Sequence, residues 1–280
     1  MSEPAGLPGL LRTAAHRHPD RAALVLPAGY RHRGGARGFR VTSYGGLQQR
    51  TDDLAARLTG AGIGPGVRTA LLVPPTLDFF ALSFALLRIG AVPVLIDPGI
   101  GLSNVRRCLA QVAPAGFVGV ARAQLARRLL RWCPDARLLV TVGARLPGCP
   151  PSLAELPADG PGLTVGSGPV TEPGPAADPR PAVRDPDLTA AIAFTSGSTG
   201  APKGVEYRQS HFLAQIDLIR SLYDVRPGEV SLSTFPPFAL FGPALGLTTV
   251  IPRMDPSRPA HVDPARVADA ANSFGATLMF

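Results

Sequence analysis

Lysine is nearly missing from this sequence. Of its 28 basic residues, 27 are arginine and a single one, Lys203, is lysine. The two side chains are not interchangeable, because a guanidinium is a planar fork whereas an ammonium is a compact charge on a flexible stem that can reach a phosphate. Lys203 is therefore a candidate for a role that needs an ammonium.

Cysteine is also scarce, and its pattern excludes two kinds of site. Cys108, Cys133 and Cys149 are odd in number, form no C-x-x-C pair and have no histidine at ligand spacing. Neither a disulfide framework nor a zinc site is predicted, and no metal-ligating residue is assigned. The first twenty residues lack the charged and apolar regions of a secretory signal, so a reducing, cytoplasmic location is expected.

The sequence has no long uninterrupted apolar run. Its most apolar window, residues 79–96, is broken by Arg88, Gly90 and Pro93. A bilayer requires about 20 consecutive apolar residues. No membrane span is therefore predicted.

Aromatic residues make up only 6% of the chain, although its formal net charge is +8. Two runs, at 31–40 and 122–131, are dense in arginine. Neither is interleaved with the aromatic residues that stack on nucleic-acid bases. We therefore predict no nucleic-acid partner, because small molecules that bear phosphate account for the positive charge equally well.

Apolar residues are plentiful, at 45% of 280, and two periods alternate along the chain. Helical spacing with glycine or proline stops predicts helices over residues 47–58, 77–89, 103–112 and 122–132. Short continuous apolar runs predict strands over residues 67–73, 91–96, 116–120 and 137–142. This alternation predicts an α/β fold in which layered parallel sheets are flanked by helices.

Residues 144–187 interrupt the alternation. They are rich in proline and glycine and lack any period. We predict a linker without regular elements, between a first α/β subdomain (1–143) and the start of a second (188–280). In the second, residues 188–194 predict a buried strand, and Ser210 is a candidate N-cap for a helix. One face of that helix would carry Phe212, Ile216, Ile219 and Tyr223.

The predicted strand at 188–194 leads directly into the motif TSGSTGAPKG at 195–204. Glycines let successive backbone N–H groups converge on an anion, hydroxyls add short donors, and Lys203 adds charge. The motif matches neither a Walker A loop nor a nucleophile elbow, and a flexible surface loop is the alternative. We predict a phosphate-binding loop with these ligand-binding residues: Thr195, Ser196, Gly197, Ser198, Thr199, Gly200, Lys203 and Gly204.

The motif resembles the signature S/T-S-G-S/T-T-G-x-P-K-G of the adenylate-forming superfamily, and it matches in full. The likeness extends over roughly residues 40–280 and implies the large N-terminal lobe of that fold. It implies that Lys203, Ser198 and Thr199 handle the β- and γ-phosphates of ATP with Mg²⁺, with Lys203 and Thr199 catalytic. A carboxylate would attack the α-phosphate and give an acyl-adenylate and pyrophosphate. Positioning and charge neutralisation would carry that step.

A second segment, residues 233–246, matches in place the part of the superfamily that borders the acyl pocket. It looks most like the β-lactone synthetases of olefin and β-lactone biosynthesis, and Ala239 stands where many acyl-activating members have histidine. The resemblance implies a fatty or β-hydroxy fatty acid substrate. The alternatives are an acyl-CoA or acyl-AMP ligase, with CoA as a further substrate, and a noncatalytic nucleotide-binding module. The implied pocket residues are Phe235, Phe238, Ala239, Phe241 and Gly242, although the three phenylalanines would also fit plain core positions.

The remaining polar candidates are interpreted structurally. His211 is expected to cap a helix or to lie on the surface rather than to face a nucleotide. Asp53, Asp78 and Asp97 have no partner carboxylate for acid–base work and are expected to be solvated or capping. A polar cluster at 253–258 predicts a turn with an ion pair, and the glycines at 60–66 follow a helix rather than a strand and predict a turn.

Three residues that the superfamily uses later in its chain have no counterpart in these 280 residues. They are a glutamate for Mg²⁺, an aspartate for the ribose and a second lysine for the carboxylate. We therefore expect residues 1–280 by themselves not to complete the reaction. The apolar run at 276–280 predicts an exposed strand edge and poor solubility of the isolated segment.

Overall fold

The computed structural model describes residues 6–28, 38–157, 185–195, 202–255, 258 and 261–280. These residues form an α/β fold of two sheets and flanking helices, as predicted. The α-helices are α1 (Gly6–Arg17), α2 (Tyr44–Gly60), α3 (Leu77–Arg88), α4 (Leu102–Val112), α5 (Ala121–Leu129), α6 (Gln209–Leu222), α7 (Phe241–Leu245) and α8 (Pro264–Phe274). Short 3₁₀ turns are η1 (Pro98–Ile100), η2 (Leu153–Glu155) and η3 (Phe238–Leu240).

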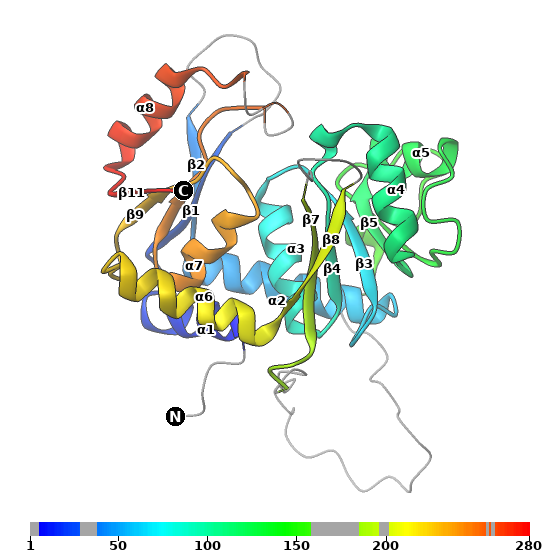
Figure 1. Cartoon of the computed structure of the whole chain (residues 1–280), viewed down its shortest axis with the longest axis horizontal. Helices are drawn as coiled ribbons and strands as arrows, with labels where there is room; N and C mark the ends of the chain where they lie inside the picture. Colours follow the sequence, from blue (N-terminus) through cyan, green and yellow to red (C-terminus); the bar gives the residue numbers. More distant parts are fainter. Residues whose placement is uncertain (1–5, 29–37, 158–184, 196–201, 256–257, 259–260) are drawn as a thin grey trace, which may run out of the picture.

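The strands fall into two sheets (Figure 1). The six-stranded sheet has the order β6-β5-β3-β4-β7-β8 and is parallel except for β8. The five-stranded sheet has the order β11-β9-β10-β1-β2 and is parallel except for β2. The first sheet contains β3 (Arg68–Leu72), β4 (Val92–Leu95), β5 (Gly116–Val120), β6 (Leu138–Val142), β7 (Thr189–Thr195) and β8 (Lys203–Arg208). The second contains β1 (Ala22–Pro27), β2 (Phe39–Ser43), β9 (Val230–Leu232), β10 (Thr248–Val250) and β11 (Leu278–Met279).

The sheets do not follow the predicted division of the chain at 144–187. Strands β7 and β8 lie beyond that segment, yet β7 pairs with β4 of the first sheet. Conversely, β1 comes early in the chain and pairs with β10 in the second sheet. Both sheets therefore combine strands from before and after the segment, and neither sheet is a contiguous stretch of sequence.

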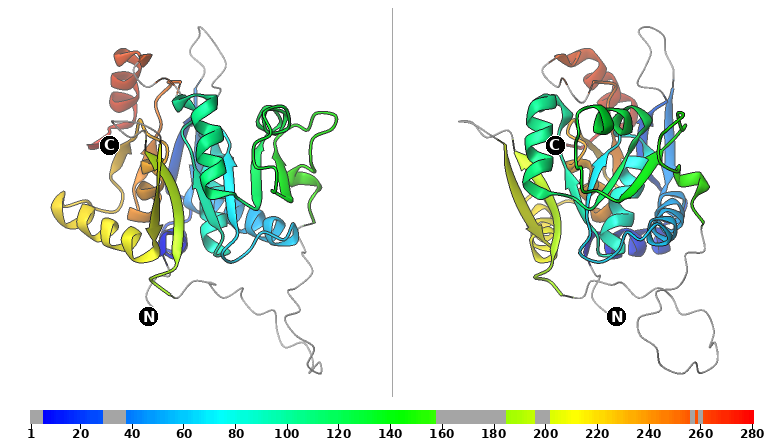
Figure 2. Two further views of the ribbon diagram at one scale, coloured as in Figure 1. Left: turned by 45° about the vertical axis from the view of Figure 1, so that its right-hand side comes forward. Right: turned by 90° about the vertical axis from the view of Figure 1, so that its right-hand side faces the viewer.

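Helices fill the space between the sheets and cover their outer faces. The main core joins α1, α2, α3 and α7 to inward residues of the first sheet such as Leu71 and Val118. A second core packs α4 on the other face of that sheet, and a third packs α8 on the five-stranded sheet. Figures 1 and 2 show α8 and α5 at opposite ends of the molecule. The arrangement is layered, with apolar surface buried on both faces of the parallel strands.

Helix α3 shows how sequence sets this arrangement. All nine residues from Phe79 to Leu87 are buried and eight of them are apolar, as expected of a helix enclosed by its neighbours. The exception, Ser83, donates its hydroxyl to Phe79 O within the helix at 2.8 Å. Asp78 lies in its first turn, as predicted, and Gly90 follows its end at φ +72°. Among the described residues, no helix combines the length and apolar character needed to cross a membrane.

The first part of the predicted linker is folded. Thr141 of β6 forms an isolated parallel bridge with Ser152, and the Ser152 N–H donates to Glu155 Oε2 at 2.8 Å. Leu153 of η2 is buried. The prediction that no regular element occurs between 144 and 187 is therefore wrong for this stretch, because a capping pair and one apolar side chain suffice to fix a short turn. Residues 158–184 lie outside the described part of the chain.

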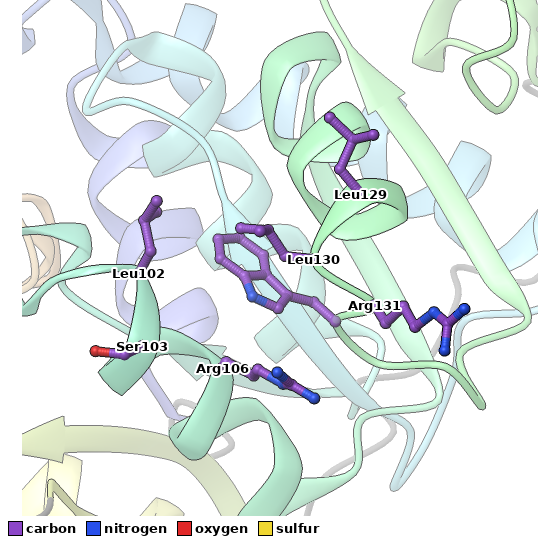
Figure 3. A pocket seen from close by; sticks show the side chains of 7 residues that line it. Leu102, Ser103, Arg106, Leu129, Leu130 and Arg131 are labelled. Atoms are coloured by element: carbon purple, nitrogen blue, oxygen red, sulfur yellow. The ribbon is translucent and has the colours of Figure 1, made fainter.

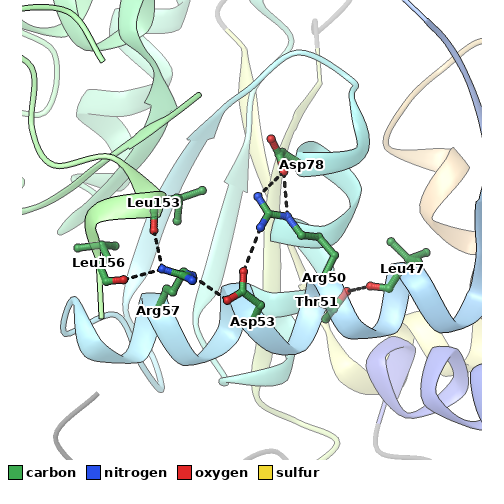
Figure 4. Close-up of polar contacts among 8 residues, drawn as sticks. All are labelled: Leu47, Arg50, Thr51, Asp53, Arg57, Asp78, Leu153 and Leu156. Carbon is green, nitrogen blue, oxygen red and sulfur yellow. Dashed lines mark hydrogen bonds and ion pairs between the residues drawn. The ribbon is translucent and has the colours of Figure 1, made fainter. Parts of the chain in front are cut away.

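An ion-pair network attaches this turn to α2 (Figure 4). Arg57 donates to Leu156 O at 2.6 Å, to Leu153 O at 3.3 Å and, through Nε, to Asp53 Oδ1 at 2.7 Å. Arg50 donates to Asp53 Oδ2 at 3.0 Å and to Asp78 Oδ1 at 2.8 Å. Asp53 and Asp78 keep 31% and 33% of their side-chain surface exposed, and each also accepts from an arginine of α2, which the sequence analysis did not predict.

Candidate functional site

The ends of the predicted phosphate loop are held together by a β-hairpin, named here the phosphate hairpin (β7 and β8). Thr195 is the register partner of Lys203, and Phe194 is that of Gly204. The hairpin joins β4 through β7, so its base is part of the six-stranded sheet. The loop residues Ser196, Gly197, Ser198, Thr199 and Gly200 lie outside the described part of the chain.

Glycine at 204 has a packing reason. A Cβ built there would lie 3.2 Å from Phe194 Cζ and 3.3 Å from its Cε1, closer than ordinary contact. The Phe194 ring packs against the second core, the one that lies between α4 and the six-stranded sheet. A side chain at 204 would therefore push this ring aside and disturb the strand that leads into the loop.

The Lys203 side chain is exposed at the first position of β8. An exposed ammonium carries no burial penalty in the free protein, and its flexible stem lets it reach a phosphate in the adjoining loop. This placement fits the phosphate-binding role proposed from the sequence. Among the described residues, no group of three or more His, Cys, Asp or Glu side chains could hold a metal ion.

The segment at residues 233–246, named here the acyl segment, separates into an outer and an inner part. Phe235 and Phe238 are 43% and 55% exposed, and their rings meet edge to face at 5.2 Å. Ala239 and Phe241 are buried in the main core. Phe241 is therefore a core residue, whereas Phe235 and Phe238 form an exposed aromatic surface.

Gly242 of α7 lies directly against Thr249 of β10. A Cβ built on Gly242 would overlap Thr249 Oγ1, which no packed structure tolerates. Thr249 is fully buried, and its hydroxyl has no hydrogen-bond partner among the described residues. The absence of a side chain at 242 thus allows α7 to rest directly on the strand.

Tyr44 fixes the other end of α7 from a distant part of the sequence. Its buried hydroxyl donates to Leu247 O at 2.8 Å and approaches Pro243 O at 3.2 Å. Burial raises the pKa of Tyr44, partly opposed by the charge of Arg21. The sequence analysis missed this contact; the available signal was that Tyr44 lies within the stretch, roughly residues 40–280, over which the likeness to the superfamily extends.

Three aromatic rings connect the phosphate hairpin to the acyl segment. Tyr207 of β8 stacks on Phe212 of α6, with centroids 5.5 Å apart and planes at 2°. Phe212 in turn meets Phe241 of α7 edge to face at 5.9 Å. The two predicted parts of the site therefore share one packed connection, although they belong to different sheets.

The predicted inward face of α6 is only partly correct. Ile216 is buried, and Phe212 and Ile219 pack against the main core. Tyr223 is 63% exposed, because the helix ends before it. The N-cap is Arg208 rather than Ser210, since the helix begins at Gln209.

The minor polar candidates have structural partners. His211 Nδ1 accepts from the Arg208 N–H at 3.2 Å, which is the predicted capping role. Asp97 Oδ1 accepts from the Gly99 N–H at 2.8 Å in a local turn. Near the predicted cluster at 253–258, the Arg253 guanidinium lies over the Phe39 ring, 5.3 Å from its centroid.

Sequence comparison identifies close relatives. The chain is 49% identical over 277 residues to the olefin beta-lactone synthetase of Xanthomonas campestris pv. campestris, and 46% identical over 281 residues to that of Stenotrophomonas maltophilia. These matches cover 99% and 100% of this chain but 46% and 48% of the relatives. The chain thus spans about half the length of the curated relatives it matches.

Solved structures of adenylate-forming enzymes and a family model also match this chain. Apo MbtA of Mycobacterium smegmatis matches with a TM-score of 0.72 at 27% identity, covering 99% of this chain and 48% of that one. The fatty acyl-adenylate ligase of L. pneumophila, in complex with acyl adenylate and pyrophosphate, has the same fold with a TM-score of 0.69 at 19% identity, covering 98% of this chain and 44% of that one. The model of the AMP-binding enzyme family matches residues 11–280. The chain belongs to the AMP-binding enzyme family.

Proposed function

We propose that this protein uses ATP to activate an apolar carboxylic acid as its acyl-adenylate and, with a β-hydroxy acid, closes the product to a β-lactone. The 46–49% identity to two olefin beta-lactone synthetases over nearly the whole chain carries the proposal. The base of the phosphate loop supports it, because register pairing brings Thr195 opposite the single lysine of the chain.

In the first step a carboxylate oxygen of the substrate bonds to the α-phosphorus of ATP, and pyrophosphate leaves. Lys203 would offset the negative charge that builds on the departing phosphates, and Ser198 and Thr199 would donate hydrogen bonds to them. Mg²⁺ would supply further charge neutralisation when bound, although the described residues contain no carboxylate cluster for it.

In the second step the substrate's own β-hydroxyl oxygen bonds to its acyl carbon. AMP leaves, and the hydroxyl proton is released. This step needs the hydroxyl to lie nearer to the acyl carbon than water or a thiol does. The Phe235–Phe238 pair offers an apolar surface on which the alkyl chain would rest, and Ala239 adds no imidazole there.

Product analysis tests the proposal. The purified full-length protein is incubated with ATP, Mg²⁺ and a long-chain β-hydroxy acid, with and without CoA, and the products are identified by mass spectrometry. We expect pyrophosphate, AMP and a β-lactone whether or not CoA is present. Acyl-CoA formed only when CoA is added would identify a CoA ligase, and ATP binding without pyrophosphate release would identify a noncatalytic nucleotide-binding protein.

A further inference from the structure

Helix α5 turns its leucines away from the protein. Leu125 and Leu129 lie four residues apart, and therefore on one side of the helix, with exposures of 49% and 73%. On its inner side α5 packs only the small Ala123 and Ala126 against the second core, and its one buried side chain is polar: Gln124 donates to Val140 O at 2.8 Å. A helix that only covers a sheet directs its apolar residues toward that sheet. The outward leucines of α5 require another explanation.

A hollow of about 340 Å³ between α4 and the end of α5 extends this apolar surface (Figure 3). Leu102 and Leu130, 61% and 38% exposed, line it together with Leu129. The nearly buried Trp132 also lines it. Four exposed leucines from two helices therefore form one surface, which we name the leucine surface (Leu102, Leu125, Leu129 and Leu130).

The part of the chain that carries the leucine surface is rich in arginine. Residues 98–157 contain eight arginines but two carboxylates, Asp135 and Glu155, and Glu155 already pairs with Arg145 at 3.2 Å. Arg106 and Arg131 line the same hollow as the leucines. A second hollow, of about 610 Å³ beside α5 and β6, is lined by Arg127, Arg128 and Arg137. Two arginines thus lie directly beside the leucines, and the surrounding segment carries an excess of positive charge.

We propose that the leucine surface and its arginines dock on an anionic lipid bilayer. Exposed leucines enter the boundary between headgroups and acyl chains, while guanidinium groups pair with lipid phosphates at its surface. Helix α5 lies at the periphery of the molecule in the views of Figures 1 and 2, where a planar surface can reach it. A fluid bilayer accommodates separate projecting side chains without a preformed complementary shape. Binding is reversible, because only one short helix and the start of another insert.

Vesicle sedimentation with matched variants tests this docking. The purified protein is mixed with vesicles of phosphatidylcholine alone or of an equimolar mixture with phosphatidylglycerol, and bound protein is measured at low and high salt. We expect binding to the anionic vesicles that falls as salt rises. Leu125→Glu with Leu129→Glu should lower the partition coefficient at least about tenfold, given the burial energy of leucine. Each of Arg106→Ser and Arg131→Ser should lower it about fivefold.

Helix α6 provides the control. Leu218 and Leu222 are also four residues apart and are 55% and 66% exposed, but Asp217 and Asp224 accompany them. Leu218→Glu with Leu222→Glu should leave vesicle binding unchanged, and circular dichroism should show every variant folded. Equal losses from the α5 and α6 variants, equal binding to both vesicle types, or no binding to anionic vesicles would overturn the proposal. So would self-association that the α5 variant abolishes, since a second copy would then cover this surface.

Discussion

The phosphate hairpin and the acyl segment acquire their geometry in opposite ways. In the acyl segment, Ala239 and Phe241 are buried in the main core, and Gly242 contacts a buried strand directly. In the phosphate hairpin, five of the six residues of β8 are exposed, and Lys203 is placed by strand register alone. Packing therefore sets one part of the site, and backbone pairing sets the other.

This difference separates stability from activity. A change in the acyl segment alters close packing and should cost folding free energy, because interiors tolerate little change in volume. A change at Lys203 removes a solvated charge and should affect only the reaction. The following substitutions test the distinction, beginning with the largest expected effect.

Gly242→Ala should destabilise the protein by about 2–4 kcal/mol, the upper range for overpacking. The new methyl group would collide with Thr249 Oγ1, and both elements that meet there are buried. Denaturant unfolding measures the loss. The double variant with Thr249→Ala should recover part of it, since the hydroxyl is removed; if the double variant is no better than additive, the close approach of α7 to β10 is not the cause.

Lys203→Ala should slow pyrophosphate release about ten- to a thousandfold while changing the unfolding free energy by less than about 0.5 kcal/mol. The ammonium is exposed, so its removal leaves no cavity. Lys203→Arg should restore the rate incompletely, because a planar fork does not replace a point charge. Arg208→Ala, at the far end of β8, is the control. Near-normal pyrophosphate release from both Lys203 variants would contradict the assigned role.

Tyr44→Phe should cost about 1–2 kcal/mol, because the carbonyls of Leu247 and Pro243 lose their buried donor. Tyr223→Phe, at an exposed position, should cost nothing measurable. The comparison of the two variants by thermal unfolding isolates the hydroxyl's contribution. A loss of the same size in both would mean that the Tyr44 hydroxyl does not anchor α7.

The same tyrosine predicts a dependence of stability on alkaline pH. Burial raises the pKa of Tyr44 in the folded protein, whereas in the unfolded chain it ionises near pH 10. Its contribution is fully present below about pH 10 and is lost as pH rises above that value, because only the unfolded state then releases the proton. Tyr44→Phe should reduce the fall in stability above pH 10, as measured by unfolding at a series of pH values.

Local sequence signals predicted the elements that depend on local interactions. The apolar runs at 67–73 and 116–120 form β3 and β5, and the mostly apolar stretch at 77–89 forms α3. Strand order was not predictable in this way, since the pairing of β1 with β10 joins residues more than 200 positions apart. The outward leucines of α5 were missed because helical spacing identifies an apolar face but not the direction in which it points.

In the candidate site, too, the features set by local sequence were predictable and those set by tertiary packing were not. The motif at 195–204 was recognisable because its order of glycines and hydroxyls, with a lysine near its end, is the order expected of a loop that binds phosphate through backbone groups. The contacts of Gly242 with Thr249 and of Tyr44 with Leu247 depend on tertiary packing, which no short pattern encodes. For the same reason, the exposure of Phe238 and the burial of Phe241 could not be distinguished in the sequence.

That last contrast yields the smallest expected effect. Phe238 is 55% exposed and contacts Phe235 edge to face, so Phe238→Ala should change the unfolding free energy by less than about 1 kcal/mol. If the Phe235–Phe238 pair supports the alkyl chain of the substrate, removing the Phe238 ring takes away part of the apolar area that the chain contacts. KM for a long-chain acid should then rise about three- to tenfold. KM for a short acid that cannot reach the pair should not change.

Phe241→Ala is the opposite case: it should destabilise the protein by about 3–5 kcal/mol, because a buried ring leaves a cavity. Equal KM values for long and short acids with Phe238→Ala, or a stability loss as large as that of Phe241→Ala, would place both rings in the packed core and remove the outer aromatic surface from the site.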